Sequence, residues 1–330
     1  MKRLPTYSDA ILDSHQLCCE SLGVIKKLKG LHYSRRYLQA YIDHIIKFFE
    51  KENGFIATAE RLKRFVHEIE NNWYNNSPTV PKKYRGVNKK LTHIFNYDGF
   101  AKRKGQGKKG GGIPLMREIL KQVRYCPYCN ADMILFIKCD DNGKTYKSAF
   151  DHFYPRSRYP FLGLSLYNLI PSCDRCNSRF KGDKYKEVLG TFHPYIDDVD
   201  TETHFVLDGL TEDMKFANEN SDGLKIKLEI KQGNRQRSKT LKNYLRLFKI
   251  NDYYSQLYPD EALRILHLGD VINESYREEI EERFLKAGIC VDPVKLLLGT
   301  PLERTEINKH HISKLKLDIL EQYCNVKVEP

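Results

Sequence analysis

The chain has 330 residues, of which 41% are hydrophobic and 30% charged, with 20 Gly and 13 Pro. This composition excludes collagen-like, mucin-like and wholly disordered proteins, and the length is enough for two domains. The net charge is +12, which favours an anionic partner, either nucleic acid or an anionic membrane surface.

The positive charge is confined to the first part of the chain. Residues 1–125 contain 25 Lys and Arg against 11 Asp and Glu, a net charge of +14. Residues 126–330 contain 30 against 32, a net charge of −2. This asymmetry predicts different roles for the two parts.

The first part is predicted to be helical over residues 8–72, because apolar and aromatic residues recur at intervals of three and four. Stripes of this kind usually form the core between helices, although aromatic rings also stack on bases. Residues 71–81 predict a loop, and residues 102–112, KRKGQGKKGGG, predict a flexible cationic linker. We therefore expect a basic helical region at 1–101 and a Gly/Lys-rich linker with a lead-in helix at 102–125.

The second part mixes strand and helix signals. A hairpin is predicted between Met133 and Phe150, around the turn sequence Asp140–Gly143. Strands are then predicted at 204–207 and 224–230. Further along, helical patterns lie at 241–247, 261–266, 276–285 and 307–323. Residues 184–330 thus read as a mixed α+β, mainly helical region.

Four of the nine cysteines form two C-x-x-C pairs, Cys126 with Cys129 and Cys173 with Cys176. Four thiolates at this spacing suit a structural zinc ion in a closed tetrahedral site. The alternatives are unrelated reduced cysteines, or a redox C-x-x-C that leaves the second pair unexplained. No secretory signal or membrane-spanning segment is predicted, so we expect a reduced, cytoplasmic protein.

The segment that the two cysteine pairs frame carries the residues suited to catalysis. It contains Asp151 next to His152, then Asn168, and Asn177 follows Cys176 directly. A neutral imidazole accepts a proton from water near neutral pH. The carboxylate of Asp151 and the amide oxygen of Asn177 are hard ligands of the kind that Mg²⁺ or Mn²⁺ prefers.

This order of residues resembles the HNH endonuclease family, whose ββα-metal fold is shared with colicin-type DNases and many restriction and phage-defence enzymes. The resemblance covers about Cys126–Asp183, and the motif positions fall on His152, Asn168 and Asn177, an H-N-N variant. It implies that His152 is the general base and that the amide of Asn168 fixes the loop around it. It also implies that Asp151 and Asn177 hold the catalytic Mg²⁺ or Mn²⁺, with zinc purely structural.

Basic residues surround this motif in the sequence, and we expect them to contact nucleic-acid phosphates. Contacts of this kind position a duplex on the protein without reading its base sequence. A solvated charged surface is the alternative. The five candidates are Arg156, Arg158, Arg175, Arg179 and Lys181.

Together these patterns predict an α+β protein with a central ββα-metal (HNH) zinc finger at 126–183, between a basic helical N-terminal region and a mixed C-terminal region at 184–330. The predicted function is metal-dependent endonuclease activity on DNA. The flanking regions resemble those of bacterial anti-phage defence nucleases of the Septu- and retron-associated type, which implies an ATPase partner. Two alternatives stay open: a ribonuclease acting on structured RNA such as tRNA, and a non-catalytic zinc-finger module that binds nucleic acid. We expect no membrane partner, because the helical stripe is Tyr-rich rather than Leu- and Trp-rich.

Overall fold

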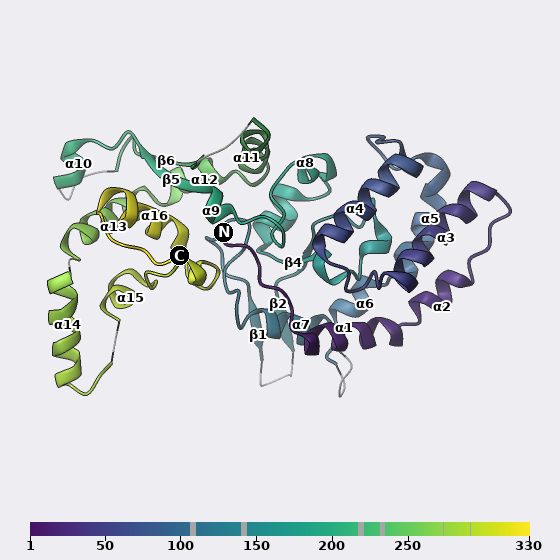
Figure 1. The fold of residues 1–330 in the computed structure, drawn as a ribbon, viewed down its shortest axis with the longest axis horizontal. Coiled ribbons are helices and arrows are strands. Elements are labelled where there is room, and N and C mark those ends of the chain that lie inside the picture. The colour runs from purple at the N-terminus through teal and green to yellow at the C-terminus, as the bar shows by residue number, and fades with distance from the viewer. Residues whose placement is uncertain (106–109, 140–143, 217–220, 232–234, 273, 291) are drawn as a thin grey trace. The chain divides into compact units, whose positions relative to one another are not determined.

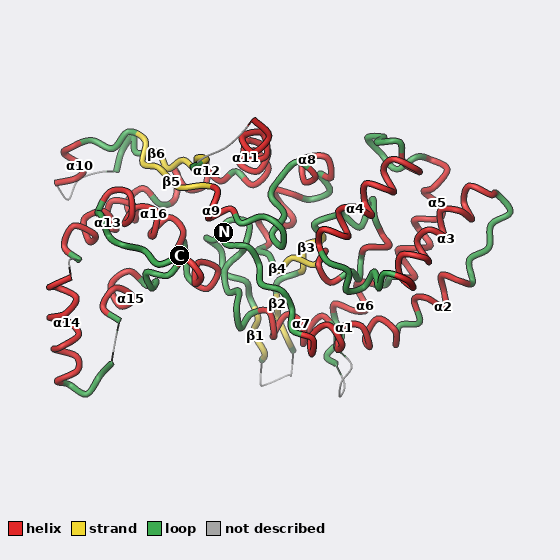
Figure 2. Tube along the Cα trace, viewed as in Figure 1, coloured by secondary structure: helices red, strands yellow, loops and turns green. Residues whose placement is uncertain are grey.

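Helices form most of the described chain, and its named strands form short antiparallel pairs (Figure 2). The computed structural model describes all residues except 106–109, 140–143, 217–220, 232–234, 273 and 291. The fold class is therefore α+β, as predicted. No helix in the described part of the chain combines the length and the apolar character needed to cross a membrane.

The chain divides into two units that differ from the predicted domains. We call residues 4–122 and 134–189 the helix–finger unit, and residues 1–3, 123–133 and 190–330 the C-terminal unit. Residues 134–183 of the predicted finger belong to the same unit as the N-terminal helices, and residues 126–133 belong to the C-terminal unit.

The helix–finger unit begins with helices, continues through the short strands of the predicted finger and ends with helix α8 (Figure 1). In chain order its elements are α1 (Asp9–Ser21), α2 (Val24–Lys29), α3 (Arg36–Lys51), α4 (Ala59–Ile69), the π-helix η1 (Glu70–Tyr74), α5 (Lys82–Ile94), α6 (Tyr97–Ala101), α7 (Gly112–Ile119), β1 (Phe136–Lys138), β2 (Thr145–Lys147), β3 (Phe150–His152), the 3₁₀-helices η2 (Pro160–Leu162) and η3 (Leu166–Asn168), β4 (Leu169–Pro171), the π-helix η4 (Arg175–Lys181) and α8 (Tyr185–Leu189).

The aromatic stripe of the N-terminal helices forms core, as the periodicity predicts. Tyr41 and Phe48 of α3 are buried, and the Phe48 ring stacks on Phe65 of α4 with centroids 3.8 Å apart. Thr58 precedes helix α4, and its hydroxyl accepts a hydrogen bond from the Arg61 backbone N–H and so caps the helix. These rings are consequently not available to stack on bases.

The glycine run at the end of the predicted linker is packed rather than free. A Cβ atom at Gly110 would lie 2.7 Å from Ser14 Oγ, and one at Gly112 would lie 2.6 Å from the Cα of Ala101. Only glycine allows the backbone to approach α1 and α6 this closely. The expectation of a flexible tether is therefore wrong for residues 110–112, while residues 106–109 lie outside the described part.

The predicted hairpin between Met133 and Phe150 is present. Strands β1 and β2 pair antiparallel, with Ile137 opposite Tyr146. The turn predicted at Asp140–Gly143 lies outside the described residues. A second antiparallel pair, β3 with β4, sets His152 opposite Leu169, and all residues of both strands are buried.

The C-terminal unit contains a two-stranded sheet and a set of helices. Its elements are α9 (Val199–Glu202), β5 (Thr203–Asp208), α10 (Glu212–Phe216), β6 (Lys225–Ile230), α11 (Arg235–Phe248), α12 (Ile250–Leu257), α13 (Pro259–Val271), α14 (Glu274–Lys286), α15 (Pro293–Leu298), the 3₁₀-helix η5 (Arg304–Lys309) and α16 (Ser313–Tyr323). The two strands predicted here are confirmed and pair with each other as β5 and β6.

The helix predicted at 307–323 is interrupted. η5 ends at Lys309, Ile312 has a left-handed φ of 43°, and α16 begins at Ser313. Asn130 explains the break, because it accepts the hydrogen bonds of two backbone N–H groups at this point. The Ile312 N–H donates to its backbone oxygen at 2.8 Å, and the Lys314 N–H to its side-chain oxygen at 3.0 Å.

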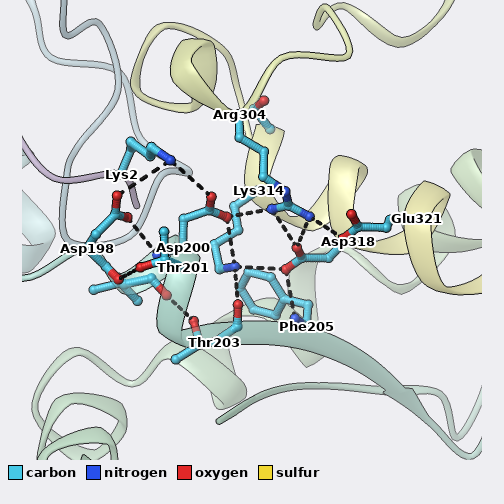
Figure 3. A network of polar contacts seen from close by, with 12 residues as sticks. Lys2, Asp198, Asp200, Thr201, Thr203, Phe205, Arg304, Lys314, Asp318 and Glu321 are labelled. Atoms are coloured by element: carbon cyan, nitrogen blue, oxygen red, sulfur yellow. Dashed lines mark hydrogen bonds and ion pairs between the residues drawn. The ribbon is translucent and has the colours of Figure 1, made fainter. Parts of the chain in front are cut away.

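A network of buried charges joins α16 to β5 and η5 within this unit (Figure 3). The Lys314 ammonium lies 3.2 Å from Asp200 and 3.0 Å from Asp318, and Arg304 lies 2.6 Å and 3.0 Å from the same carboxylates. Burial alone would raise the pKa of Asp200, but the charges of Lys314 and Arg304 outweigh that effect and hold it at about 2. The network therefore depends on both cations.

We expect Lys314→Met to lower the free energy of unfolding by about 3–5 kcal/mol, because it leaves buried carboxylates with one cation fewer. Urea denaturation of the purified chain would measure the loss. Lys286→Met is the matched control, since the Lys286–Glu282 pair on α14 is exposed and contributes little. Equal stability of the two variants would contradict this account of the network.

Candidate functional site

The four predicted zinc ligands lie together. The Sγ atoms of Cys126, Cys129, Cys173 and Cys176 are all within 4.8 Å of one another, and all four residues are buried. A tetrahedral zinc ion with Zn–S bonds of about 2.3 Å places its sulfurs about 3.8 Å apart, so the donor set fits zinc. Among the described residues, no other cluster of His, Cys, Asp or Glu side chains has this geometry.

Backbone hydrogen bonds shape each cysteine pair as a tight turn. In the first, the Asn130 N–H donates to Cys126 O at 2.7 Å, and Asn130 adopts a left-handed φ of 54°. In the second, the Cys176 N–H points at Cys173 Sγ at 3.4 Å, and Cys176 already lies in the first turn of η4. An N–H directed at a sulfur favours the thiolate form that binds metal.

His152 is held at the end of β3 with one ring nitrogen engaged. Its Nε2 lies 3.0 Å from the backbone oxygen of Gly163, and its ring meets the Tyr97 ring edge to face at 4.4 Å. A carbonyl oxygen only accepts, so Nε2 carries the proton and Nδ1 keeps the lone pair. Burial lowers the pKa of His152 to about 3, against a smaller opposite effect of the Gly163 carbonyl. The imidazole is therefore neutral at physiological pH.

Asn168 is fully buried and uses its whole amide on the loop that follows His152. Its oxygen accepts from the Tyr154 N–H at 2.7 Å, and its Nδ2 donates to Tyr154 O at 3.2 Å and to Leu162 O at 3.0 Å. Its own backbone oxygen accepts from the Phe153 N–H at 3.0 Å. These bonds fix the loop between His152 and Gly163, the two residues that set the direction of the imidazole.

Asp151 does not form an open cation site with its neighbours. Its Oδ1 accepts a hydrogen bond from Lys181 Nζ at 2.7 Å, and the same ammonium donates to His152 O at 2.7 Å. Asn177, the other expected ligand, lies half-buried on η4. A divalent cation needs several oxygen ligands, and an ammonium already lies against the carboxylate oxygen expected to be one of them. As they stand, these residues do not fit Mg²⁺ or Mn²⁺.

The predicted phosphate contacts separate into two groups. Arg158 and Lys181 are buried, each paired with a carboxylate: Arg158 with Glu70 at 2.6 Å and Lys181 with Asp151. Neither presents its charge to solvent in this structure, and contact of these two residues with nucleic acid stays a prediction. Arg156 and Arg175 are half-buried, and Arg179 is exposed, 3.6 Å from Asp174. These three remain candidates.

Helix α5 carries a basic surface that the reading of the motif did not single out. Its sequence KKYRGVNKKLTHI contains no acidic residue, and its five Lys and Arg side chains are all exposed. Lys83 lies over the rings of Tyr37 and Tyr84, at 5.2 Å and 5.1 Å from their centroids. The sequence shows this run of like charges, but only the structure shows that all five side chains are exposed on a single helix.

The comparisons with known proteins give one partial relative. Neither the known protein families nor the solved structures give a match. The chain is similar to Protein ea31 of Escherichia phage lambda, with 43% identity over 61 residues. That stretch is 18% of this chain and spans 20% of the phage protein, so the likeness is local.

Proposed function

We propose that this chain is an endonuclease of the HNH type that hydrolyses phosphodiester bonds in DNA, with His152 as the general base. The observation that carries the proposal is the state of the His152 ring. The Gly163 carbonyl accepts a hydrogen bond from the protonated Nε2, which leaves the lone pair of Nδ1 as the proton acceptor. In the sequence, His152 stands between the two cysteine pairs, on a strand that pairs with β4. The resemblance to HNH nucleases supplies the reaction class.

In the proposed reaction, Nδ1 of His152 takes a proton from the water that attacks phosphorus. The neutral imidazole is competent for this at physiological pH, although burial makes it a weak base. An incoming phosphate brings negative charge, which favours the protonated ring and so assists the transfer. Asn168 is a positioning residue, because it fixes the loop that holds the ring and does not contact the reacting atoms.

We propose that cleavage requires Mg²⁺ or Mn²⁺, and this requirement is to be tested because the expected ligand Asp151 is paired with Lys181. We assign no step to the metal. Zinc belongs to the proposal as a structural ion in the cysteine cluster, where it has no open coordination position.

The basic surface of α5 is proposed to bind the nucleic-acid backbone. The logarithm of the affinity for DNA falls as the logarithm of the salt concentration rises. Exchanging Lys82 and Lys89 for Gln should make this slope less steep by up to about 1.8, because each phosphate contact contributes about 0.9 to its magnitude. Fluorescence anisotropy with a labelled duplex would measure the slopes. A variant with Lys239→Gln and Lys242→Gln, two exposed lysines on α11, makes the same charge change elsewhere and should leave the slope unchanged. Equal slopes for the two variants would rule out the α5 surface.

The direct test is a cleavage assay of the full chain on plasmid DNA and on tRNA, with Mg²⁺ or Mn²⁺ added or omitted. We expect metal-dependent cleavage of the plasmid. Cleavage of tRNA alone would identify a ribonuclease. Metal-independent binding without cleavage of either polymer would identify a nucleic-acid-binding module and contradict the proposal.

The biological setting is proposed from the resemblance alone: bacterial defence against phage, together with an ATPase partner. Exposed apolar side chains on helices of the C-terminal unit, such as Leu257 and Leu285, are compatible with protein binding. Affinity purification of the chain from its host would test this setting, and recovery without an ATPase would count against it.

A further inference from the structure

We propose that Lys181 keeps divalent cations away from Asp151, so that Asp151 becomes a metal ligand only when the ammonium of Lys181 is displaced. This inference rests on the proposed function, because it concerns the metal that the proposed nuclease would use. It explains why Asp151 and its neighbours do not fit a divalent cation: the Lys181 ammonium occupies the oxygen atom that the cation would bind.

The contacts of Lys181 are those of a resident cation. Its Nζ lies 2.7 Å from Asp151 Oδ1 and 2.7 Å from His152 O, so it bridges two hard oxygen atoms. Both side chains of the ion pair are almost fully buried, with 2% and 3% of their surface exposed. A metal bound to Asp151 Oδ1 would lie within a few ångströms of the ammonium, where two positive charges repel strongly in a buried site. Lys181 and the metal therefore compete for the same oxygen.

The position of Lys181 is set by the end of η4. Lys181 is the last residue of that helix, and Gly182 follows with a positive φ of 49°, which glycine adopts readily. The Gly182 N–H donates to Asn177 O at 2.9 Å, which closes the helix and aims the lysine back toward β3. Asn177, on the same helix, adds no charge of its own. The ammonium is therefore placed by the backbone and does not reach Asp151 by chance.

A phosphate group would offer the ammonium another partner. Charge-assisted bonds to phosphate oxygens are as favourable as those to a carboxylate, so an anionic substrate can draw Lys181 from Asp151. In the free protein, where Lys181 lies against Asp151, we expect Mg²⁺ or Mn²⁺ to bind weakly at this carboxylate.

The test is direct Mn²⁺ binding to the zinc-loaded full chain, with free Mn²⁺ measured by electron paramagnetic resonance. We expect Lys181→Met to bind Mn²⁺ about tenfold more tightly than the wild type, or more, because a neighbouring positive charge is gone. The double variant Lys181→Met, Asp151→Asn should lose that gain. Mn²⁺ should also raise the melting temperature of Lys181→Met more than that of the wild type.

A second comparison needs no change at Lys181, in case that variant fails to fold. Asp151→Asn alone should leave the weak Mn²⁺ binding of the wild type unchanged, because the ammonium already blocks the carboxylate. Tight Mn²⁺ binding by the wild type that Asp151→Asn removes would overturn the proposal, as would unchanged affinity in a folded Lys181→Met. These readouts are independent of cleavage, so the proposed nuclease activity can fail while this inference holds.

Discussion

His152→Gln is expected to lower the rate of DNA cleavage by about 10²–10⁴-fold, the usual contribution of a general base, while folding and zinc content stay as in the wild type. The Gln amide can donate to Gly163 O in place of Nε2, but it has no basic nitrogen to replace Nδ1. His152→Ala, which removes both functions, should abolish cleavage without loss of zinc. Plasmid nicking followed on gels, with circular dichroism and metal analysis of each variant, measures these effects.

The chain offers a matched control in His15. Its Nε2 lies 2.7 Å from Leu164 O, the carbonyl next to the one that holds His152, and burial lowers its pKa to about 4. His15→Gln therefore makes the same chemical change at another buried histidine and should retain cleavage. Wild-type activity in His152→Gln, or an equal loss in the two variants, would contradict the base assignment.

The same assignment fixes the pH dependence of the reaction. Because the pKa of His152 is lowered to about 3, the free protein keeps a neutral imidazole well below neutral pH. We therefore expect kcat/KM, which reports groups of the free enzyme, to show no decrease from protonation of His152 between about pH 8 and pH 5. A decrease centred near an ordinary histidine pKa, and lost in His152→Gln, would show that the base is not the buried ring described above.

Cys176→Ser is expected to remove zinc and to destabilise the fold severely, since structural zinc ions contribute about 10–16 kcal/mol of apparent binding free energy in small zinc-binding domains. The effect follows from the geometry of the cluster, in which four buried sulfurs within 4.8 Å would repel as thiolates without a metal. The wild type should carry one zinc ion per chain by elemental analysis, and chelation should lower its melting temperature.

Cys290→Ser is the control for this change. Cys290 is exposed and lies outside the cluster, so zinc content and stability should match the wild type. A wild-type protein that purifies without zinc and is insensitive to chelators would show that the four cysteines serve another purpose.

Features formed by residues that are close together along the chain were predicted best from the sequence. The two C-x-x-C pairs and the β1–β2 hairpin are local patterns, and the structure contains both. Arg158 shows why other features were missed. Its partner Glu70 lies 88 residues away, and no local pattern distinguishes an arginine that will be buried from one that will meet phosphate.

Two further residues illustrate the same limit. The interruption before α16 depends on Asn130, which lies 184 residues before Lys314, so a helical pattern over 307–323 gave no sign of it. The sequence places Lys181 at the end of a helix, where a surface position is the usual expectation, but its ammonium lies 2.7 Å from Asp151, which is 30 residues earlier in the chain. Charged side chains are usually exposed, so a prediction that places every charged residue on the surface fails for the few that form buried ion pairs.

The buried charges of the C-terminal unit also constrain the order in which the chain can fold during synthesis. Asp200 is paired with Lys314, which leaves the ribosome 114 residues later, and the Lys2 N–H donates to Asn308, 306 residues later. Until α16 has emerged, Asp200 cannot leave water without an uncompensated charge. The helix–finger unit, by contrast, has all of its residues by position 189. We therefore expect this unit to fold first, as a nascent chain, and the C-terminal unit to remain open and dependent on chaperones until synthesis is nearly complete.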